Sequence, residues 1–157
     1  MKIKSVIETA VQMEEKGKKY YESAAAAVKS ADVKAVFEAL AVEEDFHKKH
    51  FLKMLDSAGD GVFEGASDEF IGTFMSYAGN KPMFDTAQLK ESLESDEPGS
   101  IVRAIEFAMD RELEAVIYYT SIMAAVSAGS VREIQDIIDE EMKHFVKLSK
   151  ARELVRK

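Results

Sequence analysis

Apolar residues recur at helical spacing along most of this chain. From about residue 5 to Val28 they fall at steps of three and four, which is the pattern of a helix with one buried face. The same rhythm runs from about Asp32 to Ala58, from Pro98 to Ser127, and from Ser130 almost to Lys157. The pattern therefore predicts four long helices.

Residues typical of helix ends mark these boundaries. Pro suits the first helical position because it has no N–H to donate, and Gly suits the position after the last turn. A Ser followed three residues later by Glu predicts a capping box at a helix start. The signals are the capping boxes Ser5 to Glu8 and Ser130 to Glu133, Pro98 at the start of the third helix, and Gly59 and Gly129 at the ends of the second and third.

About 40 residues separate the second and third helices, and their texture is different. They contain several glycines, an apolar segment from Phe70 to Tyr77, and a short helical pattern from Ala87 to Leu93. A loop this long without structure is unusual in a compact domain, so the segment is expected to carry short helices. The apolar segment either packs on the long helices or forms part of a contact between two copies.

One set of metal-binding residue types is written twice along the chain. Glu44 with His47 and Glu141 with His144 form two Glu-x-x-His units that lie 97 residues apart. A single Glu precedes each unit, Glu14 by 30 residues and Glu112 by 29. Residues 13 to 23 can be superposed on 111 to 121, and 43 to 47 on 140 to 144. The repeat predicts two helical hairpins.

For both hairpins to face one site, the simplest arrangement is a pseudo-twofold axis perpendicular to the bundle. The third helix then runs antiparallel to the first, and the middle segment must climb the bundle, about 35 Å for a helix of about 24 residues. We therefore predict an all-α, four-helix bundle with one long crossover between the second and third helices. The 157 residues suit a single domain, residues 1–157.

The repeated residues predict a site for two metal ions. Residues at i and i+3 share a helix face, so each Glu-x-x-His unit can direct an oxygen and a nitrogen to the same place. Four buried carboxylates carry a charge of −4, which two divalent cations balance. Carboxylate with imidazole favours iron or manganese. One Glu-x-x-His unit alone is common on solvated helix surfaces, and His50, which has no counterpart in the second half, is expected there.

Composition narrows the possible partners and compartment. The net charge is −8, with 29 acidic and 21 basic residues intermixed, so neither nucleic acid nor an anionic membrane is an expected partner. The absence of cysteine excludes a disulfide framework and a thiol redox centre. No apolar stretch reaches the length of a membrane span, and the start of the chain runs directly into a helical pattern. A cytoplasmic protein is expected.

The pattern of Glu14 with Tyr21, Glu112 with Tyr119, and the two Glu-x-x-His units resembles the erythrin domain of rubrerythrins, within the ferritin-like di-iron carboxylate superfamily. The resemblance implies a ferritin-like bundle in which Glu44 and Glu141 bridge two irons, Glu14 and Glu112 are terminal ligands, and His47 and His144 each bind one iron. It also implies that Glu43 and Glu140 each accept the free ring N–H of the opposing His.

Two pairs of residues near the ligands can be interpreted from their spacing along the helices. Tyr21 and Tyr119 each follow a ligand Glu by seven residues, two turns along the same face, where a phenol can donate a hydrogen bond to a carboxylate of the other hairpin. Gly17 and Ala115 lie at equivalent places one turn after Glu14 and Glu112. Such small side chains leave room beside the metals for dioxygen or peroxide, or allow close helix packing.

The sequence also departs from rubrerythrins. They carry a further carboxylate where Ala115 stands, and the neighbouring Glu114 lies about 100° away around an ideal helix. The missing cysteines mean that the rubredoxin-like iron centre of full rubrerythrins is missing as well. Any electrons are then expected from an external donor protein.

Three hypotheses follow for the function. The first is a rubrerythrin-like oxidoreductase that uses two iron ions to reduce hydrogen peroxide or dioxygen, with manganese allowed in one or both positions. The second is a ferritin-type protein that oxidises and stores iron. The third is a bundle in which a metal, such as zinc, is purely structural. A homodimer suits the first hypothesis, whereas a cage of many subunits suits the second.

Overall fold

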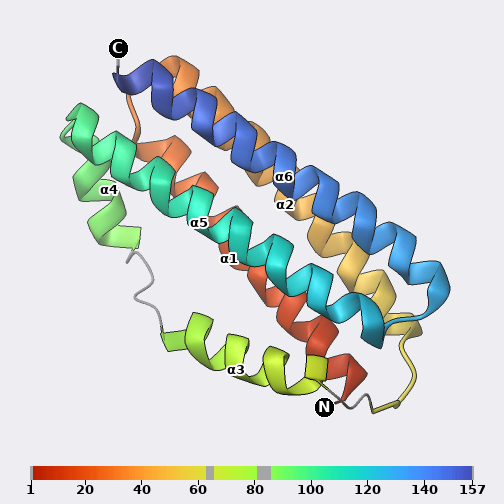
Figure 1. Cartoon of the computed structure of the whole chain (residues 1–157). Coiled ribbons are helices and arrows are strands. Elements are labelled where there is room, and N and C mark those ends of the chain that lie inside the picture. The colour runs from red at the N-terminus through yellow and green to blue at the C-terminus, as the bar shows by residue number, and fades with distance from the viewer. Residues whose placement is uncertain (1, 63–65, 81–85, 157) are drawn as a thin grey trace.

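The computed structural model describes residues 2–62, 66–80 and 86–156, and these residues are almost entirely helical (Figure 1). The long helices are α1 (Ile3–Ala27), α2 (Ala31–Ser57), α5 (Pro98–Ile122) and α6 (Ala128–Arg156). The segment between α2 and α5 contains the shorter helices α3 (Ala66–Asn80) and α4 (Thr86–Glu94), and a 3₁₀ helix, η1 (Met123–Ala125), follows α5.

Several helix ends agree with the sequence signals. Ser30 is the N-cap of α2, where its hydroxyl accepts a hydrogen bond from the N–H of Val33 at 3.5 Å, and Gly59 follows shortly after the last turn. Pro98 is at the start of α5, where its missing N–H costs nothing. The short helix predicted from Ala87 to Leu93 is α4.

The start of α1 differs from the prediction. The helix begins at Ile3, with Lys2 as an N-cap that makes no side-chain hydrogen bond, so the capping box predicted at Ser5 is wrong. The backbone N–H of Ile3 instead donates to the carbonyl of Gly61 at 3.1 Å. A contact with the chain that follows α2 therefore replaces a local cap and lets the helix begin earlier.

The boundary between α5 and α6 is also displaced. The regular part of α5 ends at Ile122, before the predicted Ser127, and α6 begins at Ala128. Gly129 and Ser130 therefore lie in the first turn of α6, and the predicted stop at Gly129 and cap at Ser130 are wrong. The Ser127 hydroxyl lies 3.4 Å from the backbone N–H of Ser130 and accepts its hydrogen bond, so Ser127 is the residue that caps α6.

The four long helices form two hairpins joined by a long crossover. In Figure 1, α1 and α5 run in opposite directions, as do α2 and α6, so the two hairpins have the predicted pseudo-twofold arrangement. α3 lies beside the beginning of α1, and α4 lies beside the beginning of α5 at the other end of the bundle. The segment from α2 to α5 therefore climbs the length of the bundle.

The buried apolar side chains form two clusters, one toward each end of the bundle. One cluster includes Phe37, Leu40 and Leu148, and the other includes Phe51 and Ile138. A layer of buried polar side chains separates them, because the sequence inserts Glu and His where the apolar rhythm of each long helix is interrupted. The polar layer is the candidate site.

The apolar segment of the crossover faces both the bundle and solvent. Ile71 and Phe74 of α3 are buried against the bundle, whereas Phe70 and Tyr77 are 44% and 58% exposed. The packing alternative therefore holds for Ile71 and Phe74, and Met75 is partly buried against the same cluster. No helix among the described residues has the length and apolar character required to cross a bilayer.

Candidate metal centre

All six predicted ligand side chains meet in the buried layer between the hairpins. They come from all four long helices, and each is at most 5% exposed. Two further residues of the predicted site, Tyr21 and Tyr119, are buried above and below this layer. The six are Glu14 from α1, Glu44 and His47 from α2, Glu112 from α5, and Glu141 and His144 from α6.

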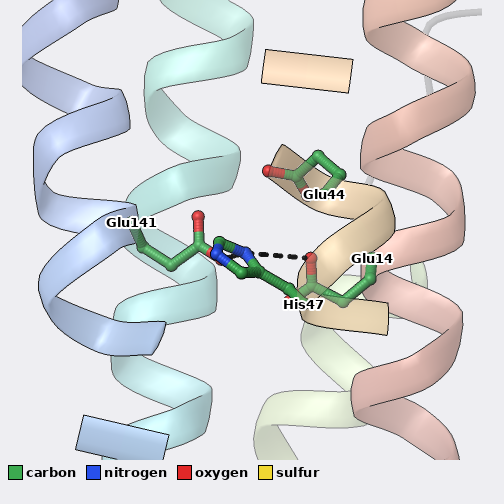
Figure 2. A group of neighbouring side chains, drawn as sticks. All are labelled: Glu14, Glu44, His47 and Glu141. Atoms are coloured by element: carbon green, nitrogen blue, oxygen red, sulfur yellow. Dashed lines mark ion pairs between the residues drawn. The ribbon is translucent and has the colours of Figure 1, made fainter. Parts of the chain in front are cut away.

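The six side chains form two overlapping groups. One group combines Glu44 and Glu141 with Glu14 and His47, and Figure 2 shows these four side chains converging from α1, α2 and α6. The other combines the same two glutamates with Glu112 and His144. Within each group the ligand atoms lie within 4.8 Å of one another. Each group could hold one metal ion, and the two ions would share two carboxylates.

The first group is centred on the imidazole of His47. Its Nδ1 atom lies 2.9 Å from Oε1 of Glu141 and 3.6 Å from Oε2 of Glu14. The second group mirrors this arrangement, because Nδ1 of His144 lies 3.2 Å from Oε1 of Glu44 and 3.6 Å from Oε2 of Glu112. The two imidazole rings are nearly parallel, with centroids 5.4 Å apart. The two halves of the site therefore face each other.

The ligand atoms approach one another without forming hydrogen bonds. Six ligand atoms are buried and have no hydrogen-bond partner among the described residues. They are both oxygens of Glu141, one oxygen each of Glu14 and Glu44, and Nδ1 of His47 and of His144. A buried polar atom without a partner costs about 1–3 kcal/mol. Six such atoms converging on two points fit a pair of metal ions, since coordination satisfies all of them.

Two tyrosines connect the hairpins through the terminal carboxylates. The hydroxyl of Tyr21 in α1 donates to Glu112 in α5, and the hydroxyl of Tyr119 in α5 donates to Glu14 in α1. Burial, reinforced by the adjacent carboxylate in each case, raises the pKa of both phenols well above the ordinary value. Each phenol therefore keeps its proton and acts as a fixed donor that orients a ligand from the opposite hairpin.

The outer ring nitrogens of the two histidines face acids from the opposite hairpin. Nε2 of His47 lies 2.7 Å from Oε2 of Glu140 with hydrogen-bond geometry, and Nε2 of His144 lies 3.0 Å from Oε2 of Glu43. Lys147 donates to both oxygens of Glu43, at 2.8 and 2.6 Å. At His47, a ring N–H donated to Glu140 at Nε2 leaves the lone pair of Nδ1 available to a metal. Nε2 of His144 lies within ion-pair distance of Glu43 but has no hydrogen-bond partner among the described residues.

The electrostatics of the layer call for positive charge. Burial raises the pKa of Glu44 well above its ordinary value, and repulsion from Glu14 and Glu141 adds to the rise. Burial, with repulsion from Glu14, raises the pKa of Glu141 to about 8. For His47, burial lowers the pKa, but the carboxylates of Glu14 and Glu141 outweigh it and raise the pKa to about 11. Protons and divalent cations therefore compete for the same negative charge.

Gly17 lies against the site for a steric reason. A Cβ atom at this position would lie 2.6 Å from Oε2 of Glu44, closer than two such atoms can approach. The glycine thus lets the Glu44 carboxylate lie against the α1 backbone. Its repeat partner Ala115 is buried on the opposite helix. His50, as expected, lies on the exposed surface, where its Nδ1 atom is 2.9 Å from the carbonyl of Phe46.

Two contributions were not found from the sequence. Lys147 donates hydrogen bonds to both oxygens of Glu43, and the sequence patterns assigned it no role. Glu114 lies outside the ligand groups, in line with its place around the helix, yet it is only 8% exposed. It is paired with Arg111, whose Nη1 atom lies 2.9 Å from its Oε2. The i, i+3 spacing of these two residues was the available signal.

A helical bundle whose repeated hairpins enclose carboxylates and imidazoles defines the ferritin-like class of protein. The rubrerythrin family model matches residues 5–152, and the chain therefore belongs to the rubrerythrin family. Its structure is similar to that of a protein from Thermotoga maritima described as ferritin-like and diiron-carboxylate, with 20% identity and a TM-score of 0.71 over 98% of this chain and 95% of that one. At this identity the likeness concerns the fold. Comparison with curated proteins gives no match.

Proposed function

We propose that the chain holds two iron ions between its hairpins and uses them to reduce hydrogen peroxide or dioxygen. The observation that carries the proposal is the sharing of Glu44 and Glu141 between two groups of buried ligands. Carboxylate is a hard ligand and imidazole a borderline one, which suits iron, and the same donors accept manganese in one or both positions. Zinc is a redox-silent substitute for the same ligands.

Each ligand has a role that its position supports. Glu44 and Glu141 would be shared by the two ions, because both belong to each group. Glu14 and His47 would complete the ligands of the first ion, and Glu112 and His144 those of the second. Six side chains around two ions leave coordination positions open, and the open positions admit a small oxidant.

When bound, the two ferrous ions supply two electrons, which together with two protons convert one hydrogen peroxide to two waters. The protein's part is to hold the ligands and to control protons. Tyr21 and Tyr119 keep their hydroxyl protons and donate hydrogen bonds to Glu112 and Glu14. These carboxylates therefore stay oriented while the charge between the hairpins changes. Glu140 and Glu43 face the outer nitrogens of His47 and His144 and stabilise ring N–H groups there.

The electrons that restore the ferrous state come, in this proposal, from an external donor protein. Support comes from the sequence, which has no cysteine to form a rubredoxin-like iron centre within the chain. We also propose a homodimer as the assembly, because the exposed apolar residues on α3 and on the outer surface of the bundle offer surface that a second copy would cover.

Rapid mixing tests the proposal. Protein loaded without oxygen with two ferrous ions per chain is mixed with hydrogen peroxide, and the absorbance of ferric iron is followed. We expect oxidation within seconds. His47→Gln should lose the fast phase, whereas His50→Gln, one turn away on the surface, should keep it. Failure of the native protein to oxidise within minutes would reject the proposal, and uptake of many irons per chain would favour storage.

A further inference from the structure

A cavity beside the candidate metal centre is much larger than a small oxidant needs. It lies between α1 and α5, has a volume of about 380 Å³, and is lined by Glu44 and Glu112 among other residues. One water takes about 30 Å³ in the liquid, and hydrogen peroxide takes roughly twice that. Pockets that bind organic ligands measure about 300–1,000 Å³. The cavity therefore has the size of an organic molecule's site.

The wall of the cavity is mainly apolar and aromatic. Phe74 and Met75 of α3 line the cavity together with residues of α1 and α5, so the crossover helix contributes to the wall. Tyr20 and Phe107 face each other, with ring centroids 5.2 Å apart. Flat apolar groups pack favourably against such rings, since aromatic pairs gain stabilisation beyond the burial of their area.

One buried donor in the wall has no partner. Arg111 is bound through Nη1 and Nη2 to Glu114, at 2.9 and 3.0 Å, and its guanidinium lies 5.0 Å from the centre of the Phe107 ring. Its Nε atom is buried and has no hydrogen-bond partner among the described residues. No water-sized atom reaches Nε in this side-chain position, so a ligand would bind it only after the guanidinium turns toward the cavity, which the 30% exposure of the Arg111 side chain permits.

The charges around the cavity favour an anion once the metals are bound. Besides Arg111, the lining contains five charged residues, which are Lys16, Lys19, Glu44, Glu112 and Glu114. Two of these acids, Glu44 and Glu112, belong to the metal ligand groups. Metal ions neutralise Glu44 and Glu112. Glu114 is then the remaining acid against three cations, one of which, Lys19, is paired with Glu15 at 3.1 Å. Lys16 is exposed at the rim.

We propose that this cavity binds a small aromatic carboxylate, with its ring between Tyr20 and the apolar wall and its carboxylate on the guanidinium of Arg111, turned toward the cavity. The inference rests on the proposed function only for the metal ions that neutralise Glu44 and Glu112. The ligand lies between the surface and the metal centre, so it is a second substrate or a regulator of oxidant access. Binding itself is the property to be tested.

The probe is 2-naphthoate, whose fluorescence reports binding, titrated into the metal-loaded full chain. We expect saturable binding of one molecule per chain with a Kd below about 1 mM, and weaker binding of the neutral 2-naphthamide. Metal-free protein should bind the probe more weakly, because Glu44 and Glu112 are then uncompensated. The double variant Arg111→Met, Glu114→Gln removes the donor without leaving its acid unpaired, and should raise Kd about tenfold or more.

The pseudo-symmetry supplies a matched pair of variants. Gln12 and its repeat partner Asp110 are both exposed, but Gln12 lines the cavity and Asp110 lies outside the lining. Gln12→Trp should narrow the cavity and raise Kd at least fivefold, whereas Asp110→Trp should leave Kd within twofold. Circular dichroism and metal content, measured on both, show that each variant folds and loads.

The outcomes separate the two proposals. Absence of saturable binding at 1 mM would overturn the inference. Equal binding by native protein, the Arg111→Met, Glu114→Gln variant and Gln12→Trp would overturn it as well, and this is the result expected if the probe binds the metals directly and not Arg111. Peroxide oxidation is measured on the same samples. Naphthoate binding without peroxide oxidation would keep the inference and reject the proposed function, and oxidation without naphthoate binding would do the reverse.

Discussion

The two hairpins direct the same side chains inward and different ones outward. On the outer side of the α1–α2 hairpin, ion pairs cross between the helices: Glu15 with Lys48 at 2.7 Å, and Lys18 with Asp45 at 2.9 Å. Further pairs run along each helix, including Lys19 with Glu15 at 3.1 Å. The seam is therefore charged beside the metal centre, whereas Val42, Phe46 and Leu52 elsewhere on α2 are apolar and 57%, 56% and 41% exposed.

The repeat positions of the α5–α6 hairpin are apolar. The repeat position of a residue in α1 is 98 residues later, as for Glu14 and Glu112, and that of a residue in α2 is 97 residues later, as for Glu44 and Glu141. On α5, Leu113 takes the place of Glu15 and Ile117 that of Lys19, and these two side chains are 45% and 47% exposed. On α6, Met142 takes the place of Asp45 and Val146 that of Lys49, with 50% and 49% exposure. The inward positions must supply ligands for one site, whereas the outward positions only need to hold two helices together, and either ion pairs or apolar contacts can do that.

The largest expected effect comes from breaking the shared inner face. Glu44→Ala removes a ligand common to both groups, so both ions should be lost, whereas Glu14→Ala and Glu112→Ala should each lose one. At a free metal concentration of about 1,000 times Kd, each ion stabilises the fold by about 4 kcal/mol. We expect the metal-induced gain in stability to vanish in Glu44→Ala and to halve in the other two. Elemental analysis and urea denaturation with and without metal measure this.

The pseudo-symmetry makes this prediction stricter. Glu14 and Glu112 occupy equivalent positions, each bound by a tyrosine of the opposite hairpin. Their alanine variants should therefore lose the same number of ions and the same stability within about 1 kcal/mol. A loss of both ions from one variant and none from the other would show that the two halves of the site are not equivalent.

The next effect is a pH dependence that metal should reverse. In the metal-free fold, burial raises the pKa of Glu141 to about 8, and neighbouring carboxylates outweigh burial to raise that of His47 to about 11. Above pH 4.5, the ordinary pKa of Glu, the folded chain therefore holds more protons than the unfolded chain. The lowered pKa of Glu112 has the opposite effect. Metal-free stability should fall as pH rises from 5 to 8, by up to about 1.4 kcal/mol per pH unit for each extra proton.

Metal-loaded protein should show the opposite trend in that window. Cations displace the protons of the inner face, so metal binding strengthens as pH rises. Urea denaturation at pH 5, 6.5 and 8, with metal and with chelator, checks both slopes. Equal slopes in the two conditions would contradict the view that the inner faces of both hairpins act as one electrostatic unit.

A smaller effect tests a position beside the ligands at which the two hairpins differ. Gly17→Ala should gain about 1 kcal/mol of helix propensity, but its Cβ would displace Glu44 from a position 2.6 Å away. We expect metal-free protein to become more stable and metal affinity to fall about tenfold. The reciprocal Ala115→Gly should cost about 1 kcal/mol and leave metal affinity within twofold. Calorimetric titration with ferrous iron measures both, and unchanged affinity in Gly17→Ala would contradict the steric argument.

The sequence predicted those features that depend on spacing along a single helix. The ligand positions, the two hairpins and the crossover follow from the repeat, because i to i+3 geometry brings each Glu and His to one face. Helix ends were predicted less well. Ser127 and Ser130 are both suitable caps, and only the geometry of the turn selects Ser127. The start of α1 depends on a contact between Ile3 and Gly61, which lie far apart in sequence.

Features built from several helices were out of reach of the sequence. The cavity between α1 and α5 depends on how closely two hairpins approach and on where α3 crosses them, and no local pattern encodes either. The same holds for Gly17, whose spacing indicated only that a small residue lies near the site. Its steric role became apparent from the position of Glu44 on another helix.

The smallest effect is expected from making the two outer seams alike. Leu113→Glu with Ile117→Lys copies the Glu15–Lys19 pair of the first hairpin onto α5. Exposed pairs at i, i+4 contribute about 0.2–0.5 kcal/mol, so the free energy of unfolding should change by less than about 1 kcal/mol, with metal content unchanged. The neutral variant Leu113→Gln with Ile117→Gln separates the ion pair from the loss of apolar surface.

A loss above about 2 kcal/mol in both variants would contradict the view that the outer seams are interchangeable. A changed elution volume on size exclusion would identify the apolar seam as a contact between copies, because an exposed pair within one chain has no reason to alter the assembly.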